Sequence, residues 1–345
     1  MSFLPYLHRV AAGESLNAAD SRSALLSILD GEASTAQVAA FLVALKMKGE
    51  TAAELTGFAR AMREKVVPVE TGLDPSSLLD TCGTGGDGVS TFNISTIAAF
   101  VTAGAGVRVA KHGNRSISSL CGSADLLESL GVAIVDDPSR IAQSIREIGI
   151  GFLFAPALHP AGRHVQPARL ELKMRTVFNL LGPLVNPAGA GRQLIGAPSL
   201  SAARLMAETL AALGAVFAFV VHGSDGMDEI TTTGSTAVFE VREGAVVERF
   251  WMPEDFGVKR ASLSSLISAD RARNLEIAEE VLAGRSGPAR DIVLINAAAA
   301  LIAAGAASSP IDAMRLAADS LSSGAARAKL DALRDFTRNA EPVRP

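Results

Sequence analysis

A glycine- and hydroxyl-rich segment at residues 80–96 carries the residue types best suited to binding an anion. Gly83, Gly85 and Gly86 can adopt positive φ angles, which lets successive backbone N–H groups turn toward one point. Asn93 is expected to be the N-cap of the following helix, whose free N–H groups and dipole also favour a phosphate. A glycine-rich turn alone is more often only a turn, but the serine and threonine hydroxyls around this one favour a phosphate site.

Two familiar nucleotide-binding patterns fit this segment only in part. Gly83-x-Gly85-x-x-Gly88 matches the dinucleotide fingerprint, yet residues 89–92 separate its glycines from the helix. A Walker A motif is absent, because no Gly-Lys-Ser/Thr follows the glycines. Asp87 lies inside the segment and would repel a diphosphate unless a cation lay between them. The composition therefore favours a diphosphate bound with Mg²⁺ over NAD.

A second segment, residues 111–119, also has the composition of a phosphate-binding loop. Lys111 and Arg115 supply positive charge, and the serines that follow Arg115 supply hydroxyl donors. For His112, a contact or packing role is at least as well supported as acid–base chemistry. Since a predicted strand ends just before Lys111, this loop should open beside the glycine-rich segment.

An adjacent acidic pair, Asp228 and Glu229, follows the apolar residues 215–221. Such a pair on its own is usually a solvated turn. Here it comes after a predicted buried strand and a His222-Gly turn, at the strand end where parallel α/β sheets bind ligands. This position favours a functional role for the pair.

The elements that must position these segments change in type near residue 70. The patterns Ser34-x-x-Gln37 and Thr51-x-x-Glu54 are typical of capping boxes at helix N-termini. Apolar residues at helical spacing follow each cap, and they are Val38, Phe41, Leu42 and Leu45, then Leu55, Phe58, Ala59 and Met62. Residues 1–72 are therefore predicted to form a small N-terminal helical domain, which ends in a linker over residues 67–75.

Beyond the linker, short apolar strands alternate with helices. The predicted strands are residues 77–80, 107–110, 151–154, 193–197 and 215–221. The last of these is apolar on both faces, as expected of a parallel strand that helices cover on both sides. We predict a larger α/β domain at residues 76–345, in which helices flank a central, mainly parallel sheet.

Composition limits the classes of protein and of partner. The 345 residues carry a formal net charge of −4, which argues against a general nucleic-acid binder. Cys82 and Cys121 are too few for a disulfide framework or a cysteine-rich zinc site, and both are expected to be buried in a reducing compartment. The first seven residues do not resemble a signal peptide. The apolar residues 292–304, interrupted by Asn296, are too short for a membrane span and are expected to form a buried helix. A cytoplasmic protein that contacts no membrane is expected.

Several long motifs occur together in one order over residues 80–229. They are Gly83-Thr-Gly-Gly-Asp87, Asn93-Ile-Ser-Thr96, Lys111-His-Gly-Asn-Arg-Ser-x-Ser-Ser119, Gly122-Ser-Ala-Asp125, His159-Pro160, Arg175-Thr-x-Phe-Asn-Leu-Leu-Gly-Pro-Leu-x-Asn-Pro187 and His222-Gly-Ser-Asp-Gly-x-Asp-Glu229. In these motifs the chain resembles the anthranilate phosphoribosyltransferases, within the nucleoside phosphorylase and phosphoribosyltransferase family. One residue departs from the pattern: Lys173 stands where that family commonly has glycine, beside the expected acceptor site.

The resemblance implies transfer of a phosphoribosyl group from phosphoribosyl pyrophosphate (PRPP) to the amine of anthranilate, in tryptophan biosynthesis. It implies that the PRPP site consists of Gly83, Gly86, Asp87, Thr91, Asn93, Ile94, Ser95, Thr96, Lys111, His112, Gly113, Asn114, Arg115, Ser116, Ile117, Ser118, Ser119 and Ser123. The implied anthranilate-binding residues are Gly83, His112, Asn114, Arg169, Gly182 and Pro183. The implied Mg²⁺ ligands are Ser95, Asp228 and Glu229. No residue is needed as a general acid or base, because an aromatic amine is already neutral near pH 7.

The resemblance also bears on assembly and on the alternatives. A homodimer through the N-terminal helices is expected, and residues from about 159 to 187 should return to the helical domain, so that the acceptor binds between the domains. A pyrimidine nucleoside phosphorylase is the nearest other enzyme, but the motifs that begin at Lys111 and Arg175 argue against it. The retained Asp87, Asp228 and Glu229 argue against a nucleic-acid-binding relative that has no transferase activity.

Overall fold

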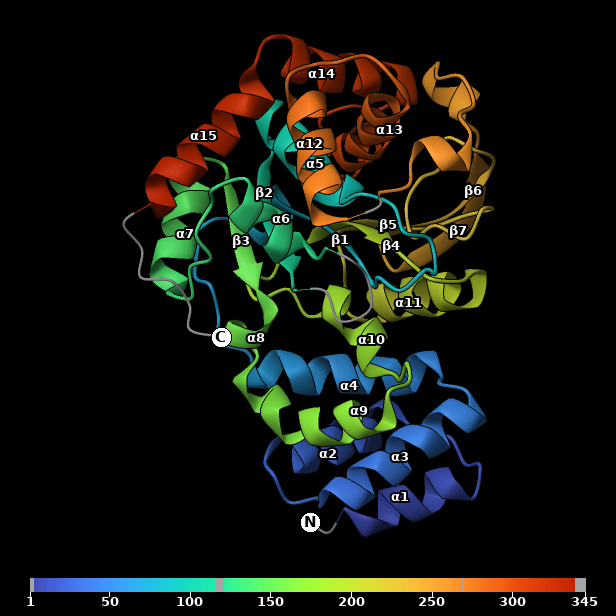
Figure 1. Cartoon of the computed structure of the whole chain (residues 1–345). Coiled ribbons are helices and arrows are strands. Elements are labelled where there is room, and N and C mark those ends of the chain that lie inside the picture. The colour runs from blue at the N-terminus through green and yellow to red at the C-terminus, as the bar shows by residue number, and fades with distance from the viewer. Residues whose placement is uncertain (1–2, 116–120, 269, 339–345) are drawn as a thin grey trace.

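The structure is a computed structural model that describes residues 3–115, 121–268 and 270–338. Four helices form the N-terminal part of the chain. They are α1 (Leu4–Ala11), α2 (Ala18–Leu29), α3 (Thr35–Lys48) and α4 (Ala52–Lys65). They form the bundle at the bottom of Figure 1. No secondary-structure element lies between α4 and the short turn of 3₁₀ helix at Pro75–Ser77, which is consistent with the expected linker.

Both predicted capping boxes are confirmed. The Ser34 hydroxyl accepts a hydrogen bond from Gln37 N at 3.3 Å, and the Gln37 amide oxygen accepts one from Ser34 N at 2.9 Å. Thr51 and Glu54 make the same reciprocal pair at the start of α4. The apolar residues predicted behind the caps are all buried: Val38, Phe41, Leu42, Leu45, Leu55, Phe58, Ala59 and Met62. Cap and apolar face together fix where these helices begin and how they pack.

A seven-stranded sheet forms the centre of the larger part of the chain, with the order β3-β2-β1-β4-β5-β6-β7. The strands are β1 (Leu78–Gly83), β2 (Arg108–Gly113), β3 (Ile150–Phe154), β4 (Arg192–Gly196), β5 (Phe217–Gly223), β6 (Thr236–Arg242) and β7 (Ala245–Trp251). The first five strands pair in parallel, and β5, β6 and β7 pair antiparallel. The predicted fold class is confirmed, whereas the β6–β7 hairpin was not predicted.

Helices cover both faces of the sheet. On one face lie α5 (Ile94–Gly104), α13 (Pro288–Ala303), α14 (Pro310–Ser322) and α15 (Ala325–Thr337). On the other face α11 (Leu200–Ala212) packs against β5 and β6 and also contacts α4, so it joins the sheet to the bundle (Figure 1). Along β5, Phe219 and Val221 are buried in the hydrophobic core shared with α5 and α13. Ala218 and Val220 are buried in the core shared with α11 and the N-terminal helices. The strand is apolar on both faces, as expected.

The chain returns to the N-terminal bundle after β3. It does so through α8 (Ala155–Leu158), α9 (Gln166–Leu172) and α10 (Phe178–Leu181). Helix α9 packs beside α3, and Val165 and Ala168 are buried in the same core as the bundle helices. Figure 1 shows α9 on the bundle and α10 between the bundle and the sheet.

The remaining helices lie around the sheet. They are α6 (Ser123–Ser129), α7 (Pro138–Glu147) and α12 (Arg271–Leu282), with further 3₁₀ turns at Pro160–His164, Gly182–Leu184, Pro253–Phe256 and Leu263–Ser265. The apolar stretch predicted to be a buried helix forms most of α13, where the Asn296 side chain bonds the backbone N and O of Ile230 at 3.0 and 2.9 Å. Cys82 and Cys121 are free and buried. No helix in the described part of the chain is long and apolar enough to cross a membrane.

Candidate active site

The point where the strand order reverses lies between β1 and β4. From β1 the chain builds the sheet toward β2 and β3, and from β4 it builds the sheet the other way toward β5. Gly83 and Gly196 are paired at the carboxyl ends of these two strands. In open α/β sheets a crevice opens at this position and holds the ligand.

Asp228 approaches this crevice closely because both strands end in glycine. A Cβ atom on Gly83 would lie 2.5 Å from Asp228 Oδ2, and one on Gly196 would lie 1.6 Å from the Asp228 carbonyl oxygen. Gly85 N donates a hydrogen bond to Asp228 Oδ2 at 2.8 Å. The glycines are therefore needed here for close packing as well as for turning the backbone.

Three carboxylates from two distant segments meet at this crevice. Asp228 N donates to Asp87 Oδ2 at 3.4 Å, and Ser95 N donates to Glu229 Oε1 at 3.2 Å. Burial, reinforced by the charge of Asp87, raises the pKa of Asp228 to about 7. Burial, reinforced by the charge of Asp228, raises the pKa of Glu229 to about 8. Burial and the neighbouring carboxylates disfavour the charged forms of Asp228 and Glu229, and a bound cation would stabilise those forms.

The donor set in this cluster suits Mg²⁺ that is shared with a phosphate. Among the described residues, no three or more His, Cys, Asp or Glu side chains are arranged to hold a metal ion by themselves. Mg²⁺ commonly takes one or two protein carboxylates and completes its shell with water and substrate phosphates. Asp228 and Glu229 supply two such carboxylates, beside the glycine-rich segment and the N-terminus of α5.

The N-terminus of α5 faces the same crevice. Asn93 is the N-cap residue, as expected, but its side chain makes no capping hydrogen bond. Instead Asn93 Oδ1 and Thr96 Oγ1 are buried without a hydrogen-bond partner in the described part of the chain. Asn93 N donates to the side chain of the buried Asn274 at 3.2 Å. Buried polar atoms without partners at a helix N-terminus indicate a site for a polar, anionic ligand.

Lys111 lies within β2, which continues to Gly113, so the strand does not end before Lys111 as predicted. Its buried ammonium group donates a hydrogen bond to Thr81 O, and burial lowers its pKa. The buried Asp80 accepts hydrogen bonds from His112 N at 3.0 Å and from Asn186 Nδ2 at 2.8 Å. Asp80 and Asn186 therefore hold the end of β2 in place. Both stand in sequence motifs, residues 80–96 and 175–187, but neither was predicted to be a site residue.

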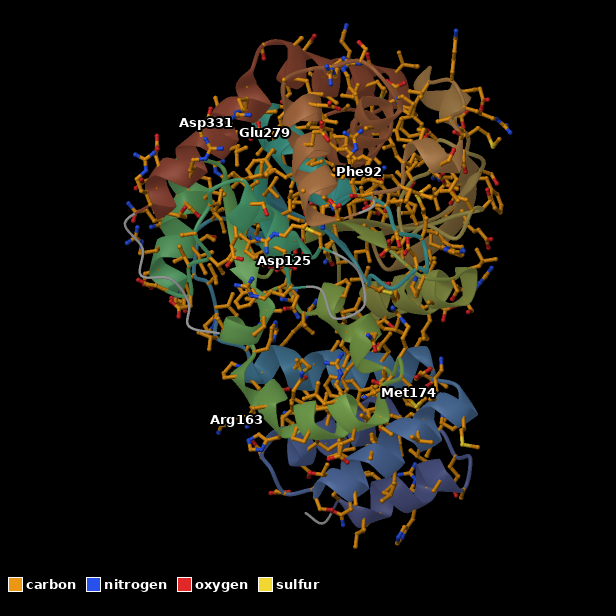
Figure 2. All side chains as sticks on the ribbon, viewed as in Figure 1. Phe92, Asp125, Arg163, Met174, Glu279 and Asp331 are labelled. Atoms are coloured by element: carbon orange, nitrogen blue, oxygen red, sulfur yellow. The ribbon has the colours of Figure 1, made fainter. Side chains whose placement is uncertain are left out.

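Asn114 and Arg115, which follow in the basic segment, both contact helix α6. Arg115 forms ion pairs with Asp125 at 3.1 Å and Glu128 at 2.6 Å, and Figure 2 labels Asp125 on this helix. The Ser123 hydroxyl bonds both the N and the O of Asn114 at 3.1 Å. The predicted phosphate-binding residues Ser116, Ile117, Ser118 and Ser119 lie outside the described residues.

Two histidines connect β2 to the returning segment. His112 Nδ1 lies 3.0 Å from Gly182 O, and His112 Nε2 lies 3.2 Å from His159 Nε2. Because a carbonyl oxygen only accepts, Nδ1 of His112 carries the proton and its Nε2 accepts from His159. Burial, with the adjacent His159, lowers the pKa of His112 to about 3. His112 is therefore neutral at pH 7, and it places the Gly182-Pro183 turn beside the end of β2.

Arg169 provides a partly buried cation on α9. Its guanidinium lies 5.7 Å from the centre of the Phe178 ring, and burial lowers its pKa. Its side chain forms no ion pair with any carboxylate in residues 3–115, 121–268 and 270–338. A guanidinium in this state is suited to the carboxylate of a small ligand.

Sequence reasoning missed further residues that the fold brings to the crevice. Asn274 supports Asn93 from the far end of the chain, and no local pattern marks it. Arg175 lies against Gly86: its Nη1 atom is 1.6 Å from the position that a Cβ atom on Gly86 would take. Arg175 stands in a motif that supported the family resemblance, although no role was assigned to it.

This combination of helical bundle, α/β domain and anion crevice defines a class of protein, the glycosyl transferases. Residues 4–66 match the family described as "Glycosyl transferase family, helical bundle domain", and residues 75–327 match "Glycosyl transferase family, a/b domain".

Similar proteins identify the group within that class. Anthranilate phosphoribosyltransferase of Solibacter usitatus is 62% identical over 336 residues, with 97% of this chain and 99% of the relative covered. The crystal structure of anthranilate phosphoribosyltransferase from Thermus thermophilus is 43% identical, covers 98% of this chain and 100% of its own, and superposes with a TM-score of 0.90. The Saccharomyces cerevisiae enzyme in complex with PRPP and Mg is 29% identical, covers 97% and 98%, and has a TM-score of 0.88. The chain belongs to the anthranilate phosphoribosyltransferase family.

Proposed function

We infer that this chain transfers the 5-phosphoribosyl group from PRPP to the amine of anthranilate, giving N-(5-phosphoribosyl)anthranilate and pyrophosphate, in tryptophan biosynthesis. One structural observation carries this inference: the glycine-rich segment, the N-terminus of α5 and the Asp228-Glu229 pair meet where the strand order reverses. The named relatives support it, and neither alternative activity has an observation in its favour.

The reaction exchanges one bond at the anomeric carbon of the ribose. The bond from that carbon to the diphosphate oxygen breaks, and its electron pair leaves with pyrophosphate. The lone pair of the anthranilate nitrogen forms the new C–N bond, and the nitrogen then releases a proton to water. Since the aromatic amine is neutral near pH 7, the main tasks of the protein are to position the two substrates and to stabilise the leaving group.

For the donor, we propose that phosphates and ribose lie against the glycine-rich segment and the start of α5. The proposed ligands are Gly83, Gly86, Asp87, Thr91, Asn93, Ile94, Ser95, Thr96, Lys111, His112, Gly113, Asn114, Arg115, Ser116, Ile117, Ser118, Ser119 and Ser123. The buried, unpartnered oxygens of Asn93 and Thr96 support the α5 part of this set. For Lys111 and Arg115 to reach a phosphate, each would exchange the partner that it has here, namely Thr81 O or the carboxylates of α6.

We propose that Ser95, Asp228 and Glu229 hold Mg²⁺ together with the donor phosphates. When bound, Mg²⁺ supplies positive charge that neutralises the diphosphate leaving group. The raised pKa values of Asp228 and Glu229 support this role, because burial and mutual repulsion disfavour their charged forms and a cation would stabilise those forms. Ser95 N already fixes Glu229 at 3.2 Å.

For the acceptor, we propose that Arg169 pairs with the anthranilate carboxylate and that Asn114 reaches its amine or carboxylate side. Gly83, His112, Gly182 and Pro183 complete the proposed acceptor site. The hydrogen bond between His112 and Gly182 supports this arrangement, because it joins the donor strand to the returning segment. In the proposed division into domains, residues 1–72 form the helical domain together with about 159–187, and residues 76–345 form the α/β domain.

We also propose a cytoplasmic homodimer that forms through the N-terminal helices. Large apolar side chains are exposed on this part of the chain, including Leu4 on α1, Met47 on α3 and Leu170 on α9. Exposed apolar groups on neighbouring helices are typical of a subunit interface. The two free, buried cysteines are consistent with a reducing compartment.

The acceptor role of Arg169 can be tested by steady-state kinetics. Arg169→Ala should raise the KM for anthranilate by about tenfold or more, because a charge-assisted pair is lost, and should leave the KM for PRPP close to wild type. Arg163→Ala is the control. This arginine lies on the same segment and is exposed (Figure 2), and among the described residues its side chain bonds only its neighbour His164, at 3.2 Å. A change confined to the KM for PRPP would reject the role of Arg169.

A further inference from the structure

Arg175 reaches the glycine-rich segment from the returning chain. Its Nη1 atom lies 1.6 Å from the position that a Cβ atom on Gly86 would take, so the guanidinium fills the space beside this glycine. Gly86 has φ +65°, a conformation in which its N–H can turn toward an anion. Arg175 comes from the short connection between α9 and α10, where Figure 2 labels its neighbour Met174.

The hydrogen bonding of Arg175 is incomplete. Its Nη2 atom is buried and has no partner among the described residues, and the hydroxyl of the adjacent Thr176 is in the same state. A guanidinium has five N–H donors and no acceptor, and burying one unpaired is unfavourable. A ligand that brings acceptor oxygens to this point would remove that cost.

The charges around Arg175 indicate which ligand this is. Arg115, an arginine of the basic segment, forms ion pairs with Asp125 and Glu128. Arg175 forms none with the described carboxylates, including Asp87 of the same segment. Its positive charge lies against the glycine-rich turn, and no carboxylate in the described part of the chain pairs with it. The fork of a guanidinium matches the geometry of phosphate oxygens.

We propose that Arg175 binds the diphosphate of the donor substrate and stays bonded to it as it leaves as pyrophosphate. This inference rests on the proposed function and adds a residue to its donor site. When the bond from the anomeric carbon to oxygen breaks, the electron pair goes to the diphosphate, and the N–H groups of Arg175 donate hydrogen bonds to it without transferring a proton. Because Arg169 lies on the helix just before Arg175, one segment would then contact both substrates.

Pyrophosphate binding tests the proposal without the transfer reaction. Titration calorimetry with inorganic pyrophosphate and Mg²⁺ should show binding to Arg175→Ala that is weaker by about tenfold or more than to wild type. Arg175→Lys should fall between the two, since lysine keeps the charge and loses the fork. Arg315→Ala is the matched control on the exposed face of α14, and it should bind as wild type does. Wild-type affinity in Arg175→Ala would overturn the proposal.

Kinetics separates this role from a structural one and from failure of the proposed function. Arg175→Ala should raise the KM for PRPP and lower kcat, and added guanidinium should restore part of the rate. A change confined to the KM for anthranilate would overturn the proposal, because Arg175 would then serve the acceptor. If Arg175→Ala does not fold, the same titrations on Arg175→Lys decide between these outcomes. Anthranilate consumption by the wild type is assayed separately, so its absence would reject the proposed function whatever the variants show.

Discussion

Replacing Gly196 by alanine would disturb the acid cluster without changing any carboxylate. The new Cβ atom would lie 1.6 Å from the Asp228 carbonyl oxygen and 3.1 Å from Asp228 Cβ. The backbone of Asp228 would have to retreat by roughly 2 Å to restore an ordinary van der Waals contact. Since Gly196 lies at the end of β4 and has no left-handed φ, alanine itself suits the local backbone. The effect should therefore come from the displacement of Asp228.

The size of the effect follows from that displacement. Overpacking of this kind costs about 1–3 kcal/mol of folding free energy. A shift of about 1 Å in a catalytic group can lower the rate by roughly 100-fold. We expect Gly196→Ala to remain folded, to lose about 100-fold or more in kcat/KM, and to need more Mg²⁺ for half-maximal activity.

The assay is anthranilate consumption as a function of Mg²⁺ concentration, together with urea unfolding. Gly162→Ala is the control, because a Cβ atom there would meet nothing within 4 Å. It should match wild type in both measurements. A Gly196→Ala variant with wild-type kcat/KM and a wild-type Mg²⁺ titration would refute the assignment of Asp228 to the site.

Three further predictions concern the same region. Burial raises the pKa of Asp228 to about 7 and of Glu229 to about 8, so the native state keeps protons that the unfolded state has lost above about pH 5. The free energy of unfolding should therefore fall as the pH rises from about 5 to about 8, more so without Mg²⁺ than with it. A rise over this range in urea-unfolding experiments would contradict this. Lys173→Gly should stabilise the fold by about 0.5–1 kcal/mol, because Lys173 ends α9 in a left-handed conformation, φ 48°, that is unfavourable for a residue other than glycine. A variant that unfolds at a lower urea concentration than wild type would contradict this. Asp228→Asn combined with Glu229→Gln should weaken Mg²⁺-dependent activity, and an unchanged Mg²⁺ titration would reject the metal role.

Local signals allowed several helices and the five parallel strands to be predicted. The capping boxes at Ser34 and Thr51 need only residues three positions apart, and both formed as predicted. Asn93 was also correctly predicted to be the N-cap residue of α5, although its side chain makes no capping hydrogen bond. A pattern in sequence can place a residue at a helix start, but it cannot tell whether its side chain serves the helix or a ligand.

The β6–β7 hairpin was missed for a physical reason. Its turn contains Glu243 and Gly244, both with positive φ, where asparagine or aspartate before glycine is the usual signal. Strand β7 lies at the edge of the sheet and exposes Val247 and Phe250, so it lacks the clean alternation of a half-buried strand. The glutamate at the turn and the exposed edge together removed the expected pattern.

The candidate site was predictable only where its residues stand in dense local motifs. Asp80, Asn186 and Arg175 stand in such motifs, but their contacts run across the fold, so the motifs did not indicate their roles. Asn274 lies outside every motif. The sequence marks Lys173 only as a residue that differs from the glycine common in the family, beside the expected acceptor site. Its positive φ gives the reason that glycine suits this position.

The most direct test of the central claim is a fluorescence assay of anthranilate consumption by the wild-type chain with PRPP and Mg²⁺. The account predicts that anthranilate disappears only when both the donor and Mg²⁺ are present, and that mass spectrometry finds N-(5-phosphoribosyl)anthranilate and pyrophosphate in equal amounts. Anthranilate that persists under these conditions, or phosphorolysis of thymidine in its place, would contradict it.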